Sequence, residues 1–344
     1  MVAVDRRDLS IVFQGPVVQR GPEARFSTEE ALLAARSLFP DATLILSTWS
    51  GSPVPDVPRL RTVLSDDPGA VRFSDRDPKL NNLNRMLLST RAGLAASATT
   101  FALKLRTDMM PTSTGFIALW ERLGIEPRQY GIFARRLLAY PVYTLAFEKG
   151  ERTMPKPFHV SDWAFFGLRA DIETLFRVPD VVEPGFSRFF EGRGATGGFD
   201  TFPDHLWRYT PEQYVVYSAF SRRFPEVRFD HKRDYDRRNI RASRVAIPNN
   251  FVILDPDQWA LRHAKPFYDR PLHEFDPICY PGFIQFGGFV RGHLRHVGWI
   301  SPSLLVGSQL RLLRSRAAFR IRALRAAGRR LGRRLFRGGR RRAS

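Results

Sequence analysis

Short apolar runs alternate with segments of helical periodicity over the first 110 residues of the chain. Four runs rich in apolar and β-forming residues end at polar or turn residues and predict buried strands, at 9–14, 42–48, 61–65 and 100–105. A capping box begins at Ser27 and is followed by apolar residues at helical spacing up to Pro40, which predicts a helix. Residues 79–96 predict a second helix. This order of elements predicts an α/β fold with a mostly parallel sheet.

The apolar pattern is less regular in the rest of the chain. Residues 185–199 are rich in glycine and aromatic residues and predict a loop. The other expected elements are strands within 131–147, 158–166 and 251–254, and helices at 168–176 and 211–224. The last of these helices has Pro211 in its first turn, where proline is favoured.

Composition and charge set the C-terminal segment apart from the body of the chain. The 344 residues suffice for a sizeable core, and the apolar share of 43% excludes a disordered or disulfide-dependent chain. The net charge is +20, but residues 310–344 hold 14 arginines and no acidic residue, which leaves only +6 on the other 309 residues. A concentrated basic segment indicates a polyanionic partner, either nucleic acid or an anionic membrane surface.

The arginine-rich tail, residues 301–344, also carries apolar residues at helical spacing from Leu310 to Leu335. A basic helix with an apolar stripe is suited to a membrane interface, with its cations toward anionic headgroups. We therefore predict an amphipathic helical tail that binds an anionic membrane surface. A solvated basic tail and RNA binding are the alternatives.

Sequence features that would direct the chain through or across a membrane are missing. No apolar run reaches ~18 residues, the length of a membrane-spanning helix, and the first residues contain no run of signal-peptide length. The single cysteine, Cys279, excludes an internal disulfide and a multi-cysteine zinc site. We expect a cytoplasmic protein that binds the inner face of the cytoplasmic membrane peripherally.

Polar side chains follow the predicted strands, where open α/β sheets bind their ligands. Gln14 and Gly15 follow or end the first strand, Thr48 ends the second, and Asp67 follows the third. The next helix begins with a polar group, Asn81, Asn82, Asn84 and Arg85. Amides suit a nucleobase or ribose and arginine suits a phosphate, whereas capping by one Asn plus a solvated surface is the structural alternative.

Lys104, Arg106 and Asp108 alternate at the end of the fourth predicted strand. The strand period of two predicts that their side chains share one face. A carboxylate between two cations is suited to a divalent metal on a diphosphate, with the cations on the phosphate oxygens. An ion pair at the sheet edge is the alternative. The usual metal-binding pattern of nucleotide-sugar transferases is Asp-x-Asp, and Arg106 occupies its first position, which leaves metal dependence open.

Two further carboxylates lie in the second half of the chain. Asp162, in the segment that starts at His159, is a candidate general base for an acceptor hydroxyl. A helix or turn cap is the alternative, because Ser161 and Asp162 are both good capping residues. Glu212 begins the predicted helix at 211–224, and the helix dipole explains its position.

The sequence lacks the motifs that are typical of several common enzyme classes. No Gly-x-Gly-x-x-Gly follows the first strand, and the chain contains neither a P-loop nor a Gly-x-Ser-x-Gly motif. The seven histidines lack metal-ligand spacing on a helix. Dinucleotide dehydrogenases, P-loop kinases and α/β-hydrolases are therefore disfavoured.

Seven short motifs occur in the order of a known family. They are IVFQGPV (11–17), FPDATLILSTW (39–49), DDPG (66–69), NNLNR (81–85), KLRTDM (104–109), HVSDWAFFG (159–167) and PEQY (211–214). With these motifs the chain resembles the WavE lipopolysaccharide-synthesis family over residues 9–260. The arginine-rich tail lies outside the resemblance.

The resemblance implies a glycosyltransferase-like protein of bacterial surface-polysaccharide assembly with a GT-A-like, Rossmann-like fold. The implied nucleotide-sugar pocket is lined by Gln14, Gly15, Thr48, Asp67, Asn81, Asn82 and Arg85. By the same analogy Asp108 lies beside the diphosphate or its metal, Mg²⁺ or Mn²⁺, and Asp162 is the catalytic base. Arg106 and Lys104 are then expected to neutralise the leaving nucleoside diphosphate.

We therefore expect residues 1–150 to bind the nucleotide-sugar donor and residues 151–300 to form the acceptor side of the same catalytic domain. The expected reaction transfers a sugar to a lipopolysaccharide core or another lipid-linked surface-polysaccharide acceptor. Two other functions stay open. One is a nucleic-acid-binding protein that uses the arginine-rich tail, although the body has no recognised nucleic-acid motif. The other is an inactive scaffold of polysaccharide assembly.

Overall fold

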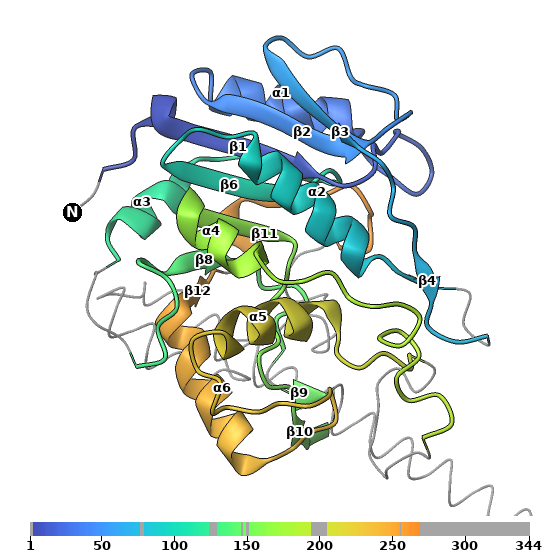
Figure 1. Ribbon diagram of the computed structural model, residues 1–344. Helices are drawn as coiled ribbons and strands as arrows, with labels where there is room; N and C mark the ends of the chain where they lie inside the picture. The colour runs from blue at the N-terminus through green and yellow to red at the C-terminus, as the bar shows by residue number, and fades with distance from the viewer. Residues whose placement is uncertain are drawn as a thin grey trace, which may run out of the picture.

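The structure is a computed structural model, drawn in Figure 1. It describes residues 3–75, 79–123, 129–145, 147–148, 151–193, 205–254 and 256–268. The arginine-rich tail, Cys279 and the last part of the loop expected at 185–199 lie outside the described residues. Within the described ranges, every helix is too short or too polar to cross a bilayer.

A seven-stranded sheet in the order β12-β8-β11-β6-β1-β2-β3 forms the centre of the protein. The strands are β1 (Leu9–Gln14), β2 (Thr43–Trp49), β3 (Leu60–Ser65), β6 (Phe101–Arg106), β8 (Leu137–Ala139), β11 (Ala164–Leu168) and β12 (Phe251–Ile253). The pairs β1–β2, β1–β6, β2–β3 and β12–β8 are parallel, and only β11 in this sheet runs against its two neighbours. The predicted α/β class with a mostly parallel sheet is confirmed.

Helices cover both faces of this sheet. They are α1 (Thr28–Leu38), α2 (Leu83–Ala95), α3 (Gly115–Glu121), α4 (Arg169–Phe176), α5 (Pro211–Ser221), α6 (Arg237–Asn250) and the short α7 (Pro256–Trp259). Figure 1 shows α2 and α4 in front of the sheet and α1 behind it. All six residues of β1 are buried, as expected for a strand covered on both faces. Ile11 and Phe13 enter one apolar core and Val12 enters the other, because successive side chains of a strand point to opposite faces.

In the part of the chain that the structure describes, three small antiparallel pairs lie outside the central sheet. They are β4 (Val71–Arg72) with β5 (Leu80–Asn81), β7 (Met109–Pro111) with β13 (Leu261–His263), and β9 (Phe147–Glu148) with β10 (Glu151–Pro155). The pair β7–β13 matters most for the site, because it brings residues after 260 to the end of β6. None of these pairs has enough length to give a periodic signal in the sequence.

The predictions hold best where the elements are long. The first two strands and the capping box of α1, in which Ser27 and Glu30 bond to each other's backbone, are confirmed. The helix expected from residue 79 begins only at Leu83, because residues 80–81 pair with 71–72. The strand expected at 158–166 was wrong in its first half. It begins at Ala164, and Phe158 has a positive φ of 57°, which no regular strand has.

The segment expected to form strands within 131–147 forms only the short β8 and one end of β9. Several backbone N–H groups of this segment donate to side chains from distant parts of the chain instead. The Asp171 carboxylate accepts the backbone N–H groups of Ala134 and Arg135, and the Asn250 side chain accepts that of Ile132. Backbone groups bound in this way do not need a strand partner.

Candidate active site

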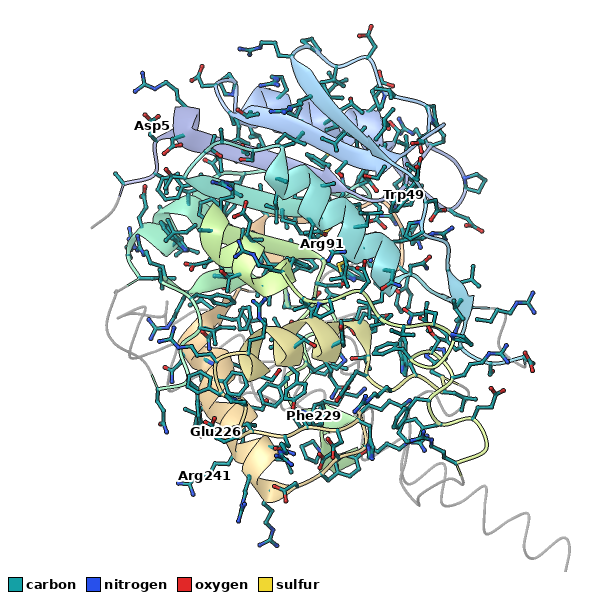
Figure 2. All side chains as sticks on the ribbon, in the orientation of Figure 1. Asp5, Trp49, Arg91, Glu226, Phe229 and Arg241 are labelled. Carbon is teal, nitrogen blue, oxygen red and sulfur yellow. The ribbon has the colours of Figure 1, made fainter. Side chains whose placement is uncertain are left out.

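A cleft of about 770 Å³ opens at one edge of the central sheet. Gln14 ends β1, Trp49 ends β2 and Arg106 ends β6, and all three line the cleft. Trp49 is labelled in Figure 2 on the side of the molecule where β2 ends. Asp162 lies just before β11, which runs in the opposite direction and so begins at this same edge. The cleft therefore lies beyond the carboxyl ends of the parallel strands, where open α/β sheets bind ligands.

The cleft gathers most of the residues that the sequence singled out. Those that line it are Gln14, Gly15, Asp67, Asn81, Asn82, Arg85, Arg106, Asp108 and Asp162. Thr48 and Lys104 are fully buried and do not line it. The Thr48 hydroxyl donates to Ser52 Oγ instead, at 3.4 Å. The structure thus does not place Thr48 in the nucleoside pocket, where the resemblance puts it.

Gly15 lies at the turn from β1 into the cleft, and its position requires glycine. Its φ is +121°, a conformation that residues with a Cβ atom rarely adopt. An added Cβ would also lie 3.2 Å from Thr107 Oγ1. The neighbouring Gln14 side chain is held by Ser89 of α2, whose hydroxyl donates to Gln14 Oε1 at 2.9 Å. The cleft floor is therefore set by backbone conformation and by a contact from α2.

Arg106 and Asp108 form a two-bonded ion pair in the cleft. The distances are 3.0 Å from Nε to Oδ1 and 2.6 Å from Nη2 to Oδ2. The guanidinium lies over the Trp163 ring, 4.5 Å from its centroid. Burial disfavours the charge on Arg106, but the Asp108 and Asp162 carboxylates outweigh it and raise the pKa of Arg106. Arg106 is therefore a fixed cation that lines the cleft.

His263 also lies beside the Asp108 carboxylate. Its Nδ1 accepts the backbone N–H of Lys265, so its Nε2 carries the proton and lies 3.3 Å from Asp108 Oδ2. Burial opposes the charge of Asp108, but Arg106 and His263 outweigh it and lower the pKa of this carboxyl. No sequence signal pointed to His263, because only the β7–β13 pairing brings it to this edge.

The environment of Asp108 does not fit a divalent metal. Both of its carboxylate oxygens already accept from Arg106, and His263 and Lys265 add further basic groups beside it. A divalent cation needs several oxygen ligands and is repelled by neighbouring cations. Among the described residues, no group of three or more His, Cys, Asp or Glu side chains could hold a metal ion.

Strand periodicity predicted that Lys104, Arg106 and Asp108 share one face. In the structure, Lys104 does not line the cleft with the other two. The strand β6 ends at Arg106, so Asp108 lies in the following turn, outside the alternation. The Lys104 ammonium instead donates to the backbone carbonyl of Asp162 and lies 5.3 Å from the centroid of the Phe176 ring. The structure therefore supports a positioning role for Lys104 rather than contact with a diphosphate.

Lys104 is expected to make the stability of the protein depend on pH. Burial lowers its pKa from 10.5 to about 7 in the folded state, while the unfolded chain keeps the ordinary value. Between these values the unfolded state binds more protons, so the free energy of unfolding rises as the pH increases from about 7. The expected slope is on the order of 1 kcal/mol per pH unit.

The measurement compares the wild type with Lys104→Met, which keeps an unbranched side chain only one atom shorter and removes the charge. Urea unfolding at several pH values should show the wild type gaining stability relative to the variant as the pH rises from about 7 toward 10. A difference that stays constant with pH would contradict the lowered pKa.

The polar residues at the start of α2 are largely occupied by the protein itself. Asn81 donates to Ser187 Oγ at 2.9 Å and accepts the backbone N–H of Leu83, and Asn84 bonds the backbone of Val181 in both directions. These contacts tie α2 to the segment at 181–187. Contacts within the protein therefore hold Asn81 and Asn84, whereas the N-cap residue Asn82 makes no side-chain cap bond, and Asn81 also lines the cleft.

Arg85 and Asp67 form an ion pair at the rim of the cleft. Arg85 Nε donates to Asp67 Oδ1 at 2.6 Å, and Nη1 donates to Asn82 Oδ1 at 2.9 Å. The Arg85 side chain holds the pKa of Asp67 below its ordinary value. This pair closes the loop after β3 onto α2, so the two side chains shape the rim together and are not independent ligands.

Asp162 and Glu212 also line the cleft. Asp162 does not cap a helix, because α4 begins seven residues later at Arg169, and within the described part of the chain its carboxylate makes no hydrogen bond. Glu212 lies in the first turn of α5, and its side chain is 14% exposed. Burial and the Asp162 charge raise the pKa of Glu212 to about 7. The helix dipole alone was therefore an incomplete explanation of Glu212.

Aromatic side chains complete the lining and were not predicted as site residues. Trp49, Phe73, Trp207 and Tyr268 all face the cleft. Phe73 and Trp207 pack edge to face with centroids 4.3 Å apart, and Tyr268 packs against Trp163 at 4.9 Å. Such rings stack on bases and on the apolar faces of sugars.

A family model for WavE lipopolysaccharide synthesis matches residues 9–276. The chain belongs to the WavE lipopolysaccharide synthesis family. The match covers every motif on which the resemblance was based and stops before the arginine-rich tail. Membership in the WavE family supports the expected activity of a glycosyltransferase in lipopolysaccharide synthesis.

The chain is also similar to a solved structure of the galactosyltransferase LgtC in complex with donor and acceptor sugar analogues. The sequence identity is 12% and the TM-score is 0.33, and the match covers 87% of this chain and 99% of that chain. No curated protein matches the chain.

Proposed function

We propose that this WavE-family protein transfers a sugar from a nucleoside-diphosphate-sugar to a lipopolysaccharide core or another lipid-linked surface polysaccharide. The observation that carries this proposal is the cleft itself. One edge of the sheet gathers a fixed cation, Arg106, a pair of carboxylates, Asp162 and Glu212, and several aromatic rings. These are the groups that a diphosphate, an acceptor hydroxyl and a base or sugar ring respectively require.

The leaving nucleoside diphosphate is neutralised by side chains of the protein in this proposal. Arg106 presents a planar fork of donors that suits phosphate oxygens, and its orientation is fixed by Asp108 and Trp163. Lys265 lines the same cleft, is exposed, and adds a second cation. Preorganised cations aimed at developing negative charge are an efficient way to stabilise a departing diphosphate.

The nucleoside and the acceptor occupy the two sides of the cleft in this proposal. Trp49 and Gln14 lie at the ends of β2 and β1 and offer a stacking face and an amide to the base. Trp207 and Glu212, from the second half of the chain, line the side assigned to the acceptor. This arrangement supports a donor part at 1–150 and an acceptor part at 151–300 of one catalytic domain. We also propose that the tail at 301–344 holds the enzyme on the cytoplasmic face of the membrane.

A thermal-shift screen with UDP-, GDP- and dTDP-sugars and the free diphosphates is expected to identify the donor. A ligand that binds only the folded state at 100 times its Kd adds about 2.7 kcal/mol of stability. That gain corresponds to a rise in Tm of several degrees in a protein of this size. Because Asp108 does not fit a metal, the shift is expected to persist in EDTA.

The screen also separates the rival functions. No shift with any nucleotide-sugar, together with salt-dependent DNA binding, would favour the nucleic-acid-binding alternative. Donor binding with no transfer to any acceptor would favour the inactive scaffold. Arg241→Ala, at an exposed position of α6 that Figure 2 shows far from Trp49, is the control and should leave the shift unchanged.

A further inference from the structure

Two carboxylates from the second half of the chain line the cleft. Asp162 comes from the turn before β11 and Glu212 from the first turn of α5, and both line the cleft. The negative charge of Asp162 raises the pKa of Glu212 by electrostatic repulsion. Two such carboxyls in a partly dry site do not both ionise readily, so the pair offers one group that takes up a proton near neutral pH.

Two basic side chains, Arg106 and Lys104, lie near Asp162, and Arg106 keeps its charge. The Asp162 carboxylate raises the pKa of Arg106 and opposes the fall in the pKa of Lys104, which shows that both basic groups lie within its field. Lys104 also donates to the backbone carbonyl of Asp162 and so fixes the turn that carries it. Asp162 therefore lies on a turn that Lys104 holds in place, beside the charged Arg106.

The surroundings of Glu212 favour proton uptake. Its Oε2 lies 3.7 Å from His159 Nε2, but burial and Lys156 lower the pKa of His159 well below 6.5, so this histidine is neutral and does not act as a counter-ion. Lys156 favours the ionised form of Glu212, and burial together with Asp162 outweighs it. The capping box of Thr210 and Gln213 fixes the first turn of α5 and with it the backbone of Glu212.

We propose that Glu212 is the catalytic base, which accepts the proton of the acceptor hydroxyl, and that Asp162 is a positioning residue that acts through Glu212. This inference rests on the proposed function, and it moves the base role from Asp162, where the sequence placed it. It also assigns a reaction role to α5, a helix whose N-terminus reaches the cleft only through the tertiary fold.

The reaction step is a single displacement. The acceptor oxygen forms a bond to the anomeric carbon of the donor as its proton passes to the Glu212 carboxylate. The bond from that carbon to the diphosphate oxygen breaks, and its electron pair leaves with the nucleoside diphosphate, whose charge Arg106 and Lys265 neutralise. One displacement at the anomeric carbon inverts its configuration, so a product of inverted configuration is expected.

The protonation of Glu212 sets the expected pH dependence. Its pKa is about 7, so the carboxyl is protonated below that pH and becomes a base above it. Turnover is expected to rise with pH through an apparent midpoint near 7 that belongs to the carboxyl pair. Removing the charge of Asp162 lowers the pKa of Glu212. In Asp162→Asn, the rising limb of the plot of turnover number against pH should therefore move to lower pH.

The test compares Glu212→Gln, Asp162→Asn and the control Glu226→Gln. Glu226 is exposed and lies beside α6 (Figure 2), so the same substitution there should change nothing. The full chain is assayed for nucleoside diphosphate release from the best donor of the thermal-shift screen, with detergent-solubilised rough lipopolysaccharide as acceptor. Donor binding is measured by thermal shift for each variant, which also reports whether it folds.

Glu212→Gln is expected to lower the turnover number by about 100-fold or more, to abolish the rising limb, and to leave donor binding unchanged. Asp162→Asn is expected to move the limb to lower pH while turnover above the midpoint stays within about tenfold of the wild type. Normal turnover in Glu212→Gln, or a loss in Asp162→Asn with no shift of the limb, would overturn the inference. A wild type that binds no nucleotide-sugar would instead overturn the proposed function, and the inference with it.

Discussion

Replacement of Arg106 by alanine is expected to lower the turnover number for sugar transfer by about 100- to 1,000-fold. Arg106 lines the cleft, carries a fixed charge and is the cation best placed to meet a diphosphate. Its removal also leaves the nearly buried Asp108 carboxylate without its two charge-assisted hydrogen bonds, so the cleft would present an anion where it had presented an ion pair. Binding of the free nucleoside diphosphate should weaken in parallel, as isothermal titration would show.

Arg106→Lys distinguishes charge from geometry at this position. Lysine keeps the positive charge but cannot form the two-bonded contact with Asp108 or stack flat on Trp163. We expect this variant to fall between the wild type and Arg106→Ala in turnover. Arg241→Ala is the control for removal of an exposed arginine. Wild-type turnover in Arg106→Ala, or activity lost in EDTA, would contradict an arginine clamp that works without a metal.

Deletion of residues 310–344 is expected to move the protein from the membrane pellet to the soluble fraction. The deleted segment holds 14 arginines and no acidic residue. Each arginine near an anionic surface contributes on the order of 1 kcal/mol, so half of them already correspond to about 7 kcal/mol of membrane binding. Donor binding should be unchanged, because every residue of the cleft lies before residue 269.

Sedimentation with vesicles provides the measurement for the tail. The full chain should pellet with vesicles that contain anionic lipid and remain in solution with neutral vesicles or at high salt. A variant with serine at Leu324 and Leu331 keeps every arginine and tests the contribution of the apolar stripe. If the truncated protein still pellets with anionic vesicles at moderate salt, the membrane contact lies elsewhere in the chain.

The first half of the fold was predictable because its signals are local. The strand at 9–14 is a continuous apolar run, and the capping box at Ser27 marks the start of α1 without reference to any other element. The helix α6 was missed, since its buried face consists of small and polar residues such as Ala242 and Ser243, and it contains Pro248. Such a face contains few strongly apolar residues, and a proline inside the segment argues against a helix, so the sequence alone gave little support for α6.

The candidate site was predictable to the extent that it follows strand ends. Gln14, Arg106 and Asp108 were expected at one edge, and they line one cleft because parallel strands end at a common edge. Their pairings were not predictable. Whether Arg85 binds a phosphate or Asp67 depends on a distance across 18 residues that no local pattern encodes. Lys104 was misplaced for another reason, because it lies two residues before the end of β6 and its side chain is fully buried.

The sequence by itself determined the class of the sheet, the family, and which residues follow the strands, because hydrophobic period and short motifs act over a few residues. Only the tertiary structure decided which residues from distant segments contact these strand ends. The reversed strand β11 and the helix α5 bring Asp162 and Glu212 together, and the β7–β13 pair brings His263 to Asp108. Electrostatic coupling depends on distance in space and on burial, so the charge state of these groups follows only once distant segments have packed together.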